Sequence, residues 1–302
     1  MLYRRKIIKP SDGYFKDITE LQPPQRDNRR LNFVLFIATV LSTTFVGSFN
    51  AGSDPFTLHG LLKGLPFSAT ILTILGVHEF AHYFTARYWG IRVTLPYFIP
   101  APISPIGTFG AVIKMKSSIP TRKALIDVGS SGPIAGFIVS FFACYFGLQM
   151  STIVQAEGNI PFFLGESLLF KTLCFQHFGH MPDGQIIQLH SVAFAGWIGL
   201  FVTALNLIPI GQLDGGHILF AFSPKIHELI RRLRVPFLIL LGLTFWSGWY
   251  VWAVLSLFFG RAHPLPDRMD QRVGSVRATI AFVASVIFII CITPTPIIIG
   301  NM

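Results

Sequence analysis

The residues with the clearest chemical meaning are His78, Glu79 and His82, which form an H-E-x-x-H motif. In a helix, four residues advance by about 400° and about 6 Å, so the two imidazoles point from one face and can bind one Zn²⁺. Glu79 then lies about 60° of rotation from His82, near the metal but free to take a proton from a water molecule. The spacing therefore predicts two metal ligands, His78 and His82, and a general base, Glu79.

The surroundings of this motif are apolar. Residues 66–89 form a segment long enough to span the hydrocarbon core of a bilayer as a helix, and the motif lies inside it. Each ionisable group at that depth costs about 3 kcal/mol. A bound divalent cation supplies a compensating partner for the three groups, and a buried, hydrogen-bonded histidine pair is the alternative interpretation.

A catalytic zinc site takes three protein ligands and leaves one position for water. The best candidate for the third ligand is Asp214, the only acidic residue in the apolar stretch 191–222. Asn206 and Pro209 interrupt the helix just before it, and Gly215-Gly216 allow a bend just after it. Broken helices occur at membrane depth where they line a cavity, so we expect one zinc ion per chain here.

Two alternatives stay open at this point. Asp214 could be a water-exposed residue at the end of a span, and His217 could either support a ligand or be an unrelated interfacial residue. A different class of membrane zinc protease would use a glutamate as third ligand, and the candidates beyond residue 82 are Glu157, Glu166 and Glu228. The first two lie in a poorly apolar loop and the third lies among basic residues.

The composition indicates a membrane protein. Of 302 residues, 52% are hydrophobic and only 13% are charged, whereas soluble chains carry roughly 25% charged residues. The net charge of +10 comes from bases at the ends of apolar runs, and no basic patch is interleaved with aromatic residues, so nucleic acid is not an expected partner. Three scattered cysteines, Cys144, Cys174 and Cys291, form neither a disulfide framework nor a zinc cluster in the sequence.

Apolar runs predict an all-α polytopic membrane protein with about six transmembrane helices. The predicted spans are residues 31–49, 66–89, 128–148, 192–209, 236–259 and 278–292. After the second span, four prolines exclude a long helix and Thr108–Met115 has the character of a strand, so we expect a short re-entrant or β-hairpin-like segment there. Gly132-x-x-x-Gly136 on the third span would let helices approach closely.

The charges of the loops predict an orientation. The segments before residue 31 and at 111–127 and 225–234 are basic, whereas 50–65 and 149–190 are not, which places both termini in the cytoplasm. The basic residues of 261–277 disagree if 236–259 is a single span. A hairpin around Ser247-Gly248 would bring them to the cytoplasmic side. Residues 1–30 are expected to form a basic cytoplasmic tail and residues 31–302 one membrane-embedded domain.

The two motifs together resemble the site-2 protease family of intramembrane zinc metalloproteases. The resemblance rests on His78–His82, on Asn206-Leu207-Ile208-Pro209 with Leu213-Asp214-Gly215-Gly216, and on Gly107-Thr108-Phe109-Gly110, which is similar to a segment of bacterial members and plastid relatives. Gly211 and Gln212 stand where the family often has prolines, and 149–190 is too short for the PDZ domain of many members. The resemblance implies that Asp214 is the third ligand.

The resemblance also implies an activity. The expected enzyme is a zinc-dependent endopeptidase that cleaves transmembrane proteins or peptides within the lipid bilayer, with Glu79 as base. Apart from the resemblance, we expect Asn206 to hydrogen-bond the substrate backbone or the developing oxyanion. The expected location is the inner membrane of a bacterium. An inactive membrane scaffold or a metal transporter is the alternative, and neither of these would require a base beside the ligands.

Overall fold

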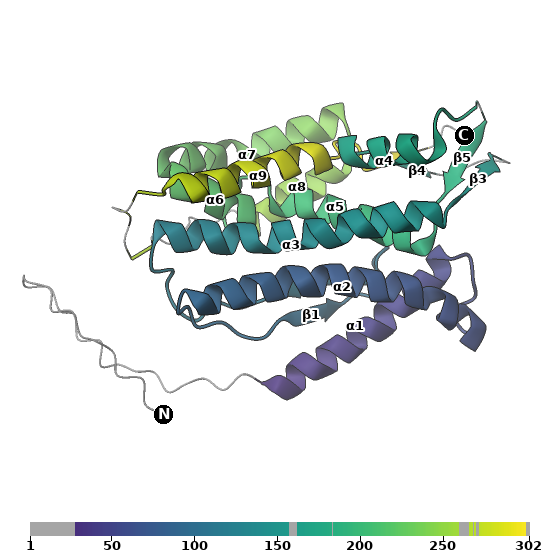
Figure 1. Ribbon diagram of the computed structural model, residues 1–302, viewed down its shortest axis with the longest axis horizontal. Coiled ribbons are helices and arrows are strands. Elements are labelled where there is room, and N and C mark those ends of the chain that lie inside the picture. Colours follow the sequence, from purple (N-terminus) through teal and green to yellow (C-terminus); the bar gives the residue numbers. More distant parts are fainter. Residues whose placement is uncertain are drawn as a thin grey trace, which may run out of the picture.

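The computed structural model of the protein describes residues 28–156, 162–182, 184–259, 266–267, 269 and 272–299. Most of the predicted tail, residues 1–27, lies outside the described residues. The described chain is mostly helical, with a few short strands (Figure 1).

Within the part of the chain that the structure describes, three helices are long and apolar enough to cross a membrane: α1 (Arg29–Asn50), α2 (Leu58–Tyr88) and α3 (Arg122–Gln149). They confirm that the first three predicted spans are helical. Each helix begins with a polar side chain that accepts a hydrogen bond from a backbone N–H of the first turn. These capping residues are Asn28, Thr57 and Thr121.

Helix α3 lies at the centre of the helix bundle. It contacts α2 on one side and, on the other, α5 (Ser191–Asn206), α6 (Asp214–Phe222) and α9 (Ser275–Cys291). In Figure 1, α2 and α3 run side by side along the long axis and α1 crosses beneath α2. This arrangement places α3 between the two regions that carry the predicted metal ligands.

The segment after α2 is a β-hairpin. Strand β1 (Tyr97–Pro100) pairs antiparallel with β2 (Thr108–Val112), with a break in register between Phe98 and Pro100. The strand predicted over Thr108–Met115 is confirmed for Thr108–Val112, and Met115 forms only an isolated bridge with Val93. The hairpin runs along α1, because the Asn32 side chain donates to the carbonyls of Leu95 and Pro96 and the Ser42 hydroxyl donates to that of Gly107 at 2.6 Å.

The prediction of one continuous span over residues 236–259 is wrong, and the alternative, a hairpin around Ser247-Gly248, is observed. Helix α7 (Pro224–Thr244) ends there and α8 (Gly248–Phe259) begins, and the two helices pack against each other. Arg234 of α7 donates to the carbonyl of Ser256 in α8, which requires the chain to double back. The physical reason is that the apolar run continues through the turn, so hydrophobicity alone does not reveal the reversal.

The described residues of the 149–190 segment contain more secondary structure than the polar loop that their composition predicts. They contain α4 (Leu168–Phe178), and β3 (Thr152–Gln155) pairs with β5 (Gln185–Gln188). Strand β4 (Phe162–Leu164) pairs with β6 (Ile297–Ile299), which follows α9. The bundle is therefore closed at the Gln149 end of α3 by a small cap of strands and one helix.

The Arg122 end of α3, opposite this cap, gathers segments that are far apart in sequence. The Arg277 guanidinium of α9 forms an ion pair with Asp127 at 2.8 Å, and the Trp89 ring N–H donates to the same carboxylate. Arg122 donates to the carbonyl of Met269. The described part of the 261–277 segment thus lies at the same end as the basic 111–127 segment.

Candidate metal centre

Helix α2 presents His78 and His82 from one face, as the spacing predicts. Their Nε2 atoms lie 3.0 Å apart, and both side chains are buried. Two imidazole nitrogens that face each other at this distance must share either a proton or a cation. The two Nε2 atoms are therefore placed to bind one common ion.

Asp214, the first residue of α6, reaches the same point from a distant part of the sequence. Its Oδ2 atom lies 3.5 Å from Nε2 of His78 and 3.3 Å from Nε2 of His82. Among the residues that the structure describes, these three form the one group of His, Cys, Asp or Glu side chains whose candidate ligand atoms all lie within 4.8 Å. Two imidazole nitrogens and one carboxylate oxygen are a donor set that fits zinc and leaves a position open.

The orientation of His82 is fixed from its far side. Its Nδ1 atom lies 2.8 Å from the carbonyl oxygen of Val128 in α3, and because a carbonyl only accepts, Nδ1 carries the proton and donates. The lone pair of Nε2 is then directed toward His78 and Asp214. Metal-binding histidines commonly have such a backbone partner, which also raises the basicity of the ligand atom.

Helix α3 approaches these imidazoles where it has glycines. A Cβ atom on Gly132 would lie 2.1 Å from Nε2 of His82, and one on Gly136 would lie 3.2 Å from Nδ1 of His78. The Gly132-x-x-x-Gly136 pattern therefore has a specific use in this fold: it makes room for the two histidine rings between α2 and α3.

Glu79 lies beside the group without belonging to it. Its Oε1 atom is 3.9 Å from Nε2 of His78, and the backbone of Ile113, just after β2, hydrogen-bonds its carboxyl group. Asn206, at the end of α5, lies on another side, with Nδ2 3.5 Å from Nε2 of His78. All five residues singled out from the sequence are thus gathered around one point.

The glutamates that were alternative third ligands lie elsewhere. Glu228 is held by Arg231 at 2.6 Å and by Arg232 at 2.8 Å on the surface of α7. Glu166 lines a cavity in the cap, and Glu157 lies outside the described residues. Neither described glutamate is part of the group around His78, so the described chain supports Asp214 as the third candidate.

Three groups around this centre were not identified from the sequence: the Val128 carbonyl, which contacts His82, and Arg122 and His227, which contact the backbone at the two ends of α6. The imidazole Nε2 of His227 in α7 donates to the carbonyl of Gly211, in the turn before Asp214, at 3.0 Å. His217 packs on α3, where a Cβ on Gly129 would lie 2.9 Å from its Cβ. The sequence around His227, which holds both Glu228 and several basic residues, gives no local indication of this contact.

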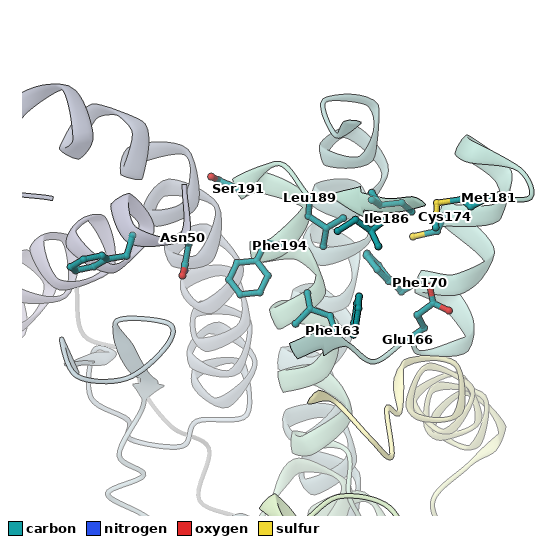
Figure 2. Close-up of a pocket in the computed structure, with 13 residues that line it drawn as sticks. Asn50, Phe163, Glu166, Phe170, Cys174, Met181, Ile186, Leu189, Ser191 and Phe194 are labelled. Carbon is teal, nitrogen blue, oxygen red and sulfur yellow. The ribbon is translucent and has the colours of Figure 1, made fainter. Parts of the chain in front are cut away.

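A cavity of about 510 Å³ lies away from this centre, in the cap at the Gln149 end, between the end of α1, α4, β4, β5 and the start of α5 (Figure 2). Its wall is mostly apolar and includes Phe163, Phe170, Cys174, Ile186 and Phe194. We call it the cap cavity.

Comparison with known proteins gives a consistent result. Peptidase family M50 matches residues 66–245, which include both motif regions. The chain is 34% identical over 220 residues to "Probable zinc metalloprotease EGY2, chloroplastic" of Oryza sativa subsp. indica, covering 70% of this chain and 39% of that protein. The proteins of the same kind in Arabidopsis thaliana named EGY2 and EGY1 are 31% identical over 244 residues and 29% identical over 238 residues.

Those alignments cover 78% and 76% of this chain but 41% and 43% of the Arabidopsis proteins. The matched part thus spans about two fifths of the length of these curated relatives. Their names specify zinc and proteolysis, and these terms describe the relatives.

Proposed function

The chain belongs to peptidase family M50, the site-2 protease family of zinc metalloproteases, and we propose that it hydrolyses peptide bonds of transmembrane segments within the bilayer. The observation that carries the proposal is the group formed by the buried His78 and His82 and the half-buried Asp214, with Glu79 beside it. A donor set that fits zinc, next to a carboxylate outside that set, is the arrangement that metal-assisted hydrolysis requires.

Each residue of the site has a role in this proposal. His78, His82 and Asp214 hold the zinc ion, which when bound polarises a substrate carbonyl and lowers the pKa of a water molecule. Glu79 takes a proton from water and passes it to the nitrogen of the leaving amine. Asn206 donates a hydrogen bond from Nδ2 to the substrate backbone.

The β-hairpin supplies a backbone edge for an unwound substrate. Strand β1 packs against α1, whereas the chain just after β2 hydrogen-bonds Glu79. A substrate segment that adds to β2 as a third strand would be held in extended form beside the base. A helical substrate has its backbone groups paired internally and must unwind before it can be cleaved.

The proposed membrane orientation follows the basic segments. We place the Arg122 end of α3 on the cytoplasmic side, with residues 1–30 as a tail there and residues 31–302 as the membrane-embedded domain. Because α7 and α8 form a hairpin, the basic 261–277 segment falls on the cytoplasmic side as well, which removes the conflict of the single-span interpretation. Strand β6 pairs with β4 in the opposite cap. In the proposed orientation the start of α1 is therefore cytoplasmic and β6 lies on the other side of the membrane. This arrangement replaces the prediction that both termini are cytoplasmic.

The proposed location is the inner membrane of a bacterium, where the lipid bilayer and membrane-embedded substrates are the partners. Separating membrane fractions of the source cells and detecting the chain by antibody would test this part directly. An inactive scaffold or a metal transporter remains the alternative function, and it leaves the position of Glu79 beside the ligand group without a purpose.

The test compares Glu79→Gln with Asp214→Asn. The first change keeps the shape of the side chain and removes its basicity, so we expect zinc content near that of the wild type and cleavage of a membrane-embedded reporter lower by about 10²- to 10⁴-fold. The second change weakens a ligand, so zinc content and cleavage should fall together.

Zinc by elemental analysis and reporter cleavage by gel would be measured side by side in detergent or nanodiscs. Substantial cleavage by the Glu79→Gln variant would overturn the role of the base. Metal uptake into vesicles that survives Glu79→Gln would favour a transporter.

A further inference from the structure

Asp214, the proposed third ligand, lies on a short helix. Helix α6 has 9 residues and begins at Asp214 itself. The cap residue Leu213 makes no side-chain hydrogen bond to the first turn of the helix. In contrast, His78 and His82 lie well inside α2, which has 31 residues. A helix of about two and a half turns has little stability of its own, so its position must be fixed by its neighbours.

The turn before Asp214 is packed onto the first turn of α6. A Cβ on Gly215 would lie 2.0 Å from the carbonyl oxygen of Leu207, and one on Gly216 would lie 2.4 Å from that of Gly211. Gly211 itself has a φ of 55°, in the left-handed region. A displacement of this turn would therefore displace the Asp214 carboxylate with it.

His227 holds the turn from α7. Its side chain is 2% exposed, its Nε2 atom donates to the Gly211 carbonyl at 3.0 Å, and its ring meets the edge of Phe220. A buried carbonyl needs a donor, so this bond fixes where the left-handed residue lies. The contact links α7 to the start of α6 across 16 residues of sequence.

Arg122 holds the other end of α6. Its Nε atom donates to the carbonyl of Ala221 at 2.7 Å and its Nη2 atom to that of Phe222 at 3.2 Å. The last carbonyls of a helix lack partners within the helix and carry partial negative charge, so a guanidinium there is favourable. Arg122 is also the first residue of α3, the helix whose Val128 carbonyl orients His82.

We infer that His227 and Arg122 are positioning residues that clamp α6 at its two ends and thereby set the Asp214 carboxylate against the two histidines. Neither residue reaches the ligand group itself. The inference rests on the proposed metal site. It states in addition that the affinity for zinc depends on the contacts that α7 and α3 make with the short helix α6.

The experiment measures how fast a chelator removes zinc from the purified full-length protein in nanodiscs. His227→Phe keeps an aromatic ring against Phe220 and removes the donor, whereas His227→Gln restores an N–H near the position of Nε2. We expect roughly 10- to 100-fold faster zinc release for the phenylalanine variant, the range seen when outer contacts of metal ligands are lost, and a rate near that of the wild type for the glutamine variant. Arg122→Gln should also release zinc faster than Arg122→Lys.

Leu173→Ala is the control in the cap. Leu173 is buried in α4 and is not part of the clamp, so this variant should melt at a lower temperature and release zinc at the wild-type rate. Release at the wild-type rate by His227→Phe would overturn the inference, and so would release by Leu173→Ala or His227→Gln that is as fast as release by His227→Phe. A wild-type protein that binds no zinc would overturn the proposed function and the inference together. If Asp214→Asn loses zinc but the His227 and Arg122 variants keep it as the wild type does, only the inference is overturned.

Discussion

The metal centre and the cap cavity are opposite kinds of space. At the centre, two helices approach so closely that a single Cβ on Gly132 would collide with a histidine ring. In the cap, five elements leave about 510 Å³ empty between mostly apolar side chains. The buried ionisable groups that could bind metal are in the crowded region, and the large hollow has few polar groups.

The cap cavity also lacks an activated nucleophile among its described residues. Its thiol belongs to Cys174, and burial, followed by the nearby Glu166 carboxylate, raises the pKa of this thiol to about 12. At neutral pH the thiol is protonated and reacts poorly. The comparison teaches that the candidate metal site of this fold is identified by donor atoms that converge where two helices are in close contact. The volume of a cavity does not identify it.

The largest expected effect that tests this comparison comes from Gly132→Ala. The added methyl group would occupy the place of the His82 ring, so the ring must move away from Asp214 or α3 must shift. We expect zinc affinity to fall by roughly 100-fold, the upper end of the effect of disturbing contacts around metal ligands. Competition with a calibrated zinc chelator measures it.

Gly76→Ala is the control for Gly132→Ala. Gly76 lies on α2, and a Cβ there would meet only the ring of Phe98 at 3.9 Å, an ordinary contact. The same chemical change should leave zinc affinity as it is and slightly favour the helix. Equal zinc affinity in both variants would mean that the close approach of α3 does not shape the centre.

The parts of the centre that could be predicted from the sequence are those that follow from local periodicity. His78 and His82 share a helix face whatever the rest of the fold does. Asp214 could be singled out because it is an isolated acid in an apolar stretch, and the resemblance gave it a role. The structure ends α2 just before Gly90, which has a φ of 74°, and a glycine directly after a helix is a stop signal that can be read from sequence.

The remaining contacts depend on tertiary packing and left no local signal. Val128 acts through its backbone carbonyl, which every residue has, and it meets His82 across 46 residues of sequence. The pattern of glycines on α3 indicated close packing but not that histidine rings would fill the space. Hydrophobicity did not reveal the reversal between α7 and α8, because both arms are apolar, and only the charges of 261–277 together with Ser247-Gly248 indicated it as an alternative.

A smaller effect is expected on the substrate side of the centre, from Val112→Pro. Val112 is the last residue of β2, and proline there removes a backbone donor and disturbs the strand. Loss of one backbone hydrogen bond of about 1 kcal/mol corresponds to a roughly fivefold lower kcat/KM for a model transmembrane substrate. Zinc content should not change.

Val112→Ala separates the backbone from the side chain. The Val112 side chain is 50% exposed, so alanine keeps the N–H and removes only an exposed apolar group. We expect cleavage near the wild-type rate for this variant. If the proline variant folds normally and cleaves as fast as the alanine variant, β2 does not receive the substrate.

The smallest effect is expected in the cap cavity, from Phe163→Ala. Phe163 lies in the middle of β4, lines the cavity and is 39% exposed (Figure 2). Its truncation enlarges a space that is already open, so the loss of stability should stay near 1 kcal/mol, well below that of a fully buried phenylalanine. Zinc content and reporter cleavage should both remain within about twofold of the wild type, because no ligand of the centre touches the cap. Cleavage that fell tenfold with full zinc content would place the cavity on the path of the substrate, and the division between a catalytic centre and an inert cap would then have to be abandoned.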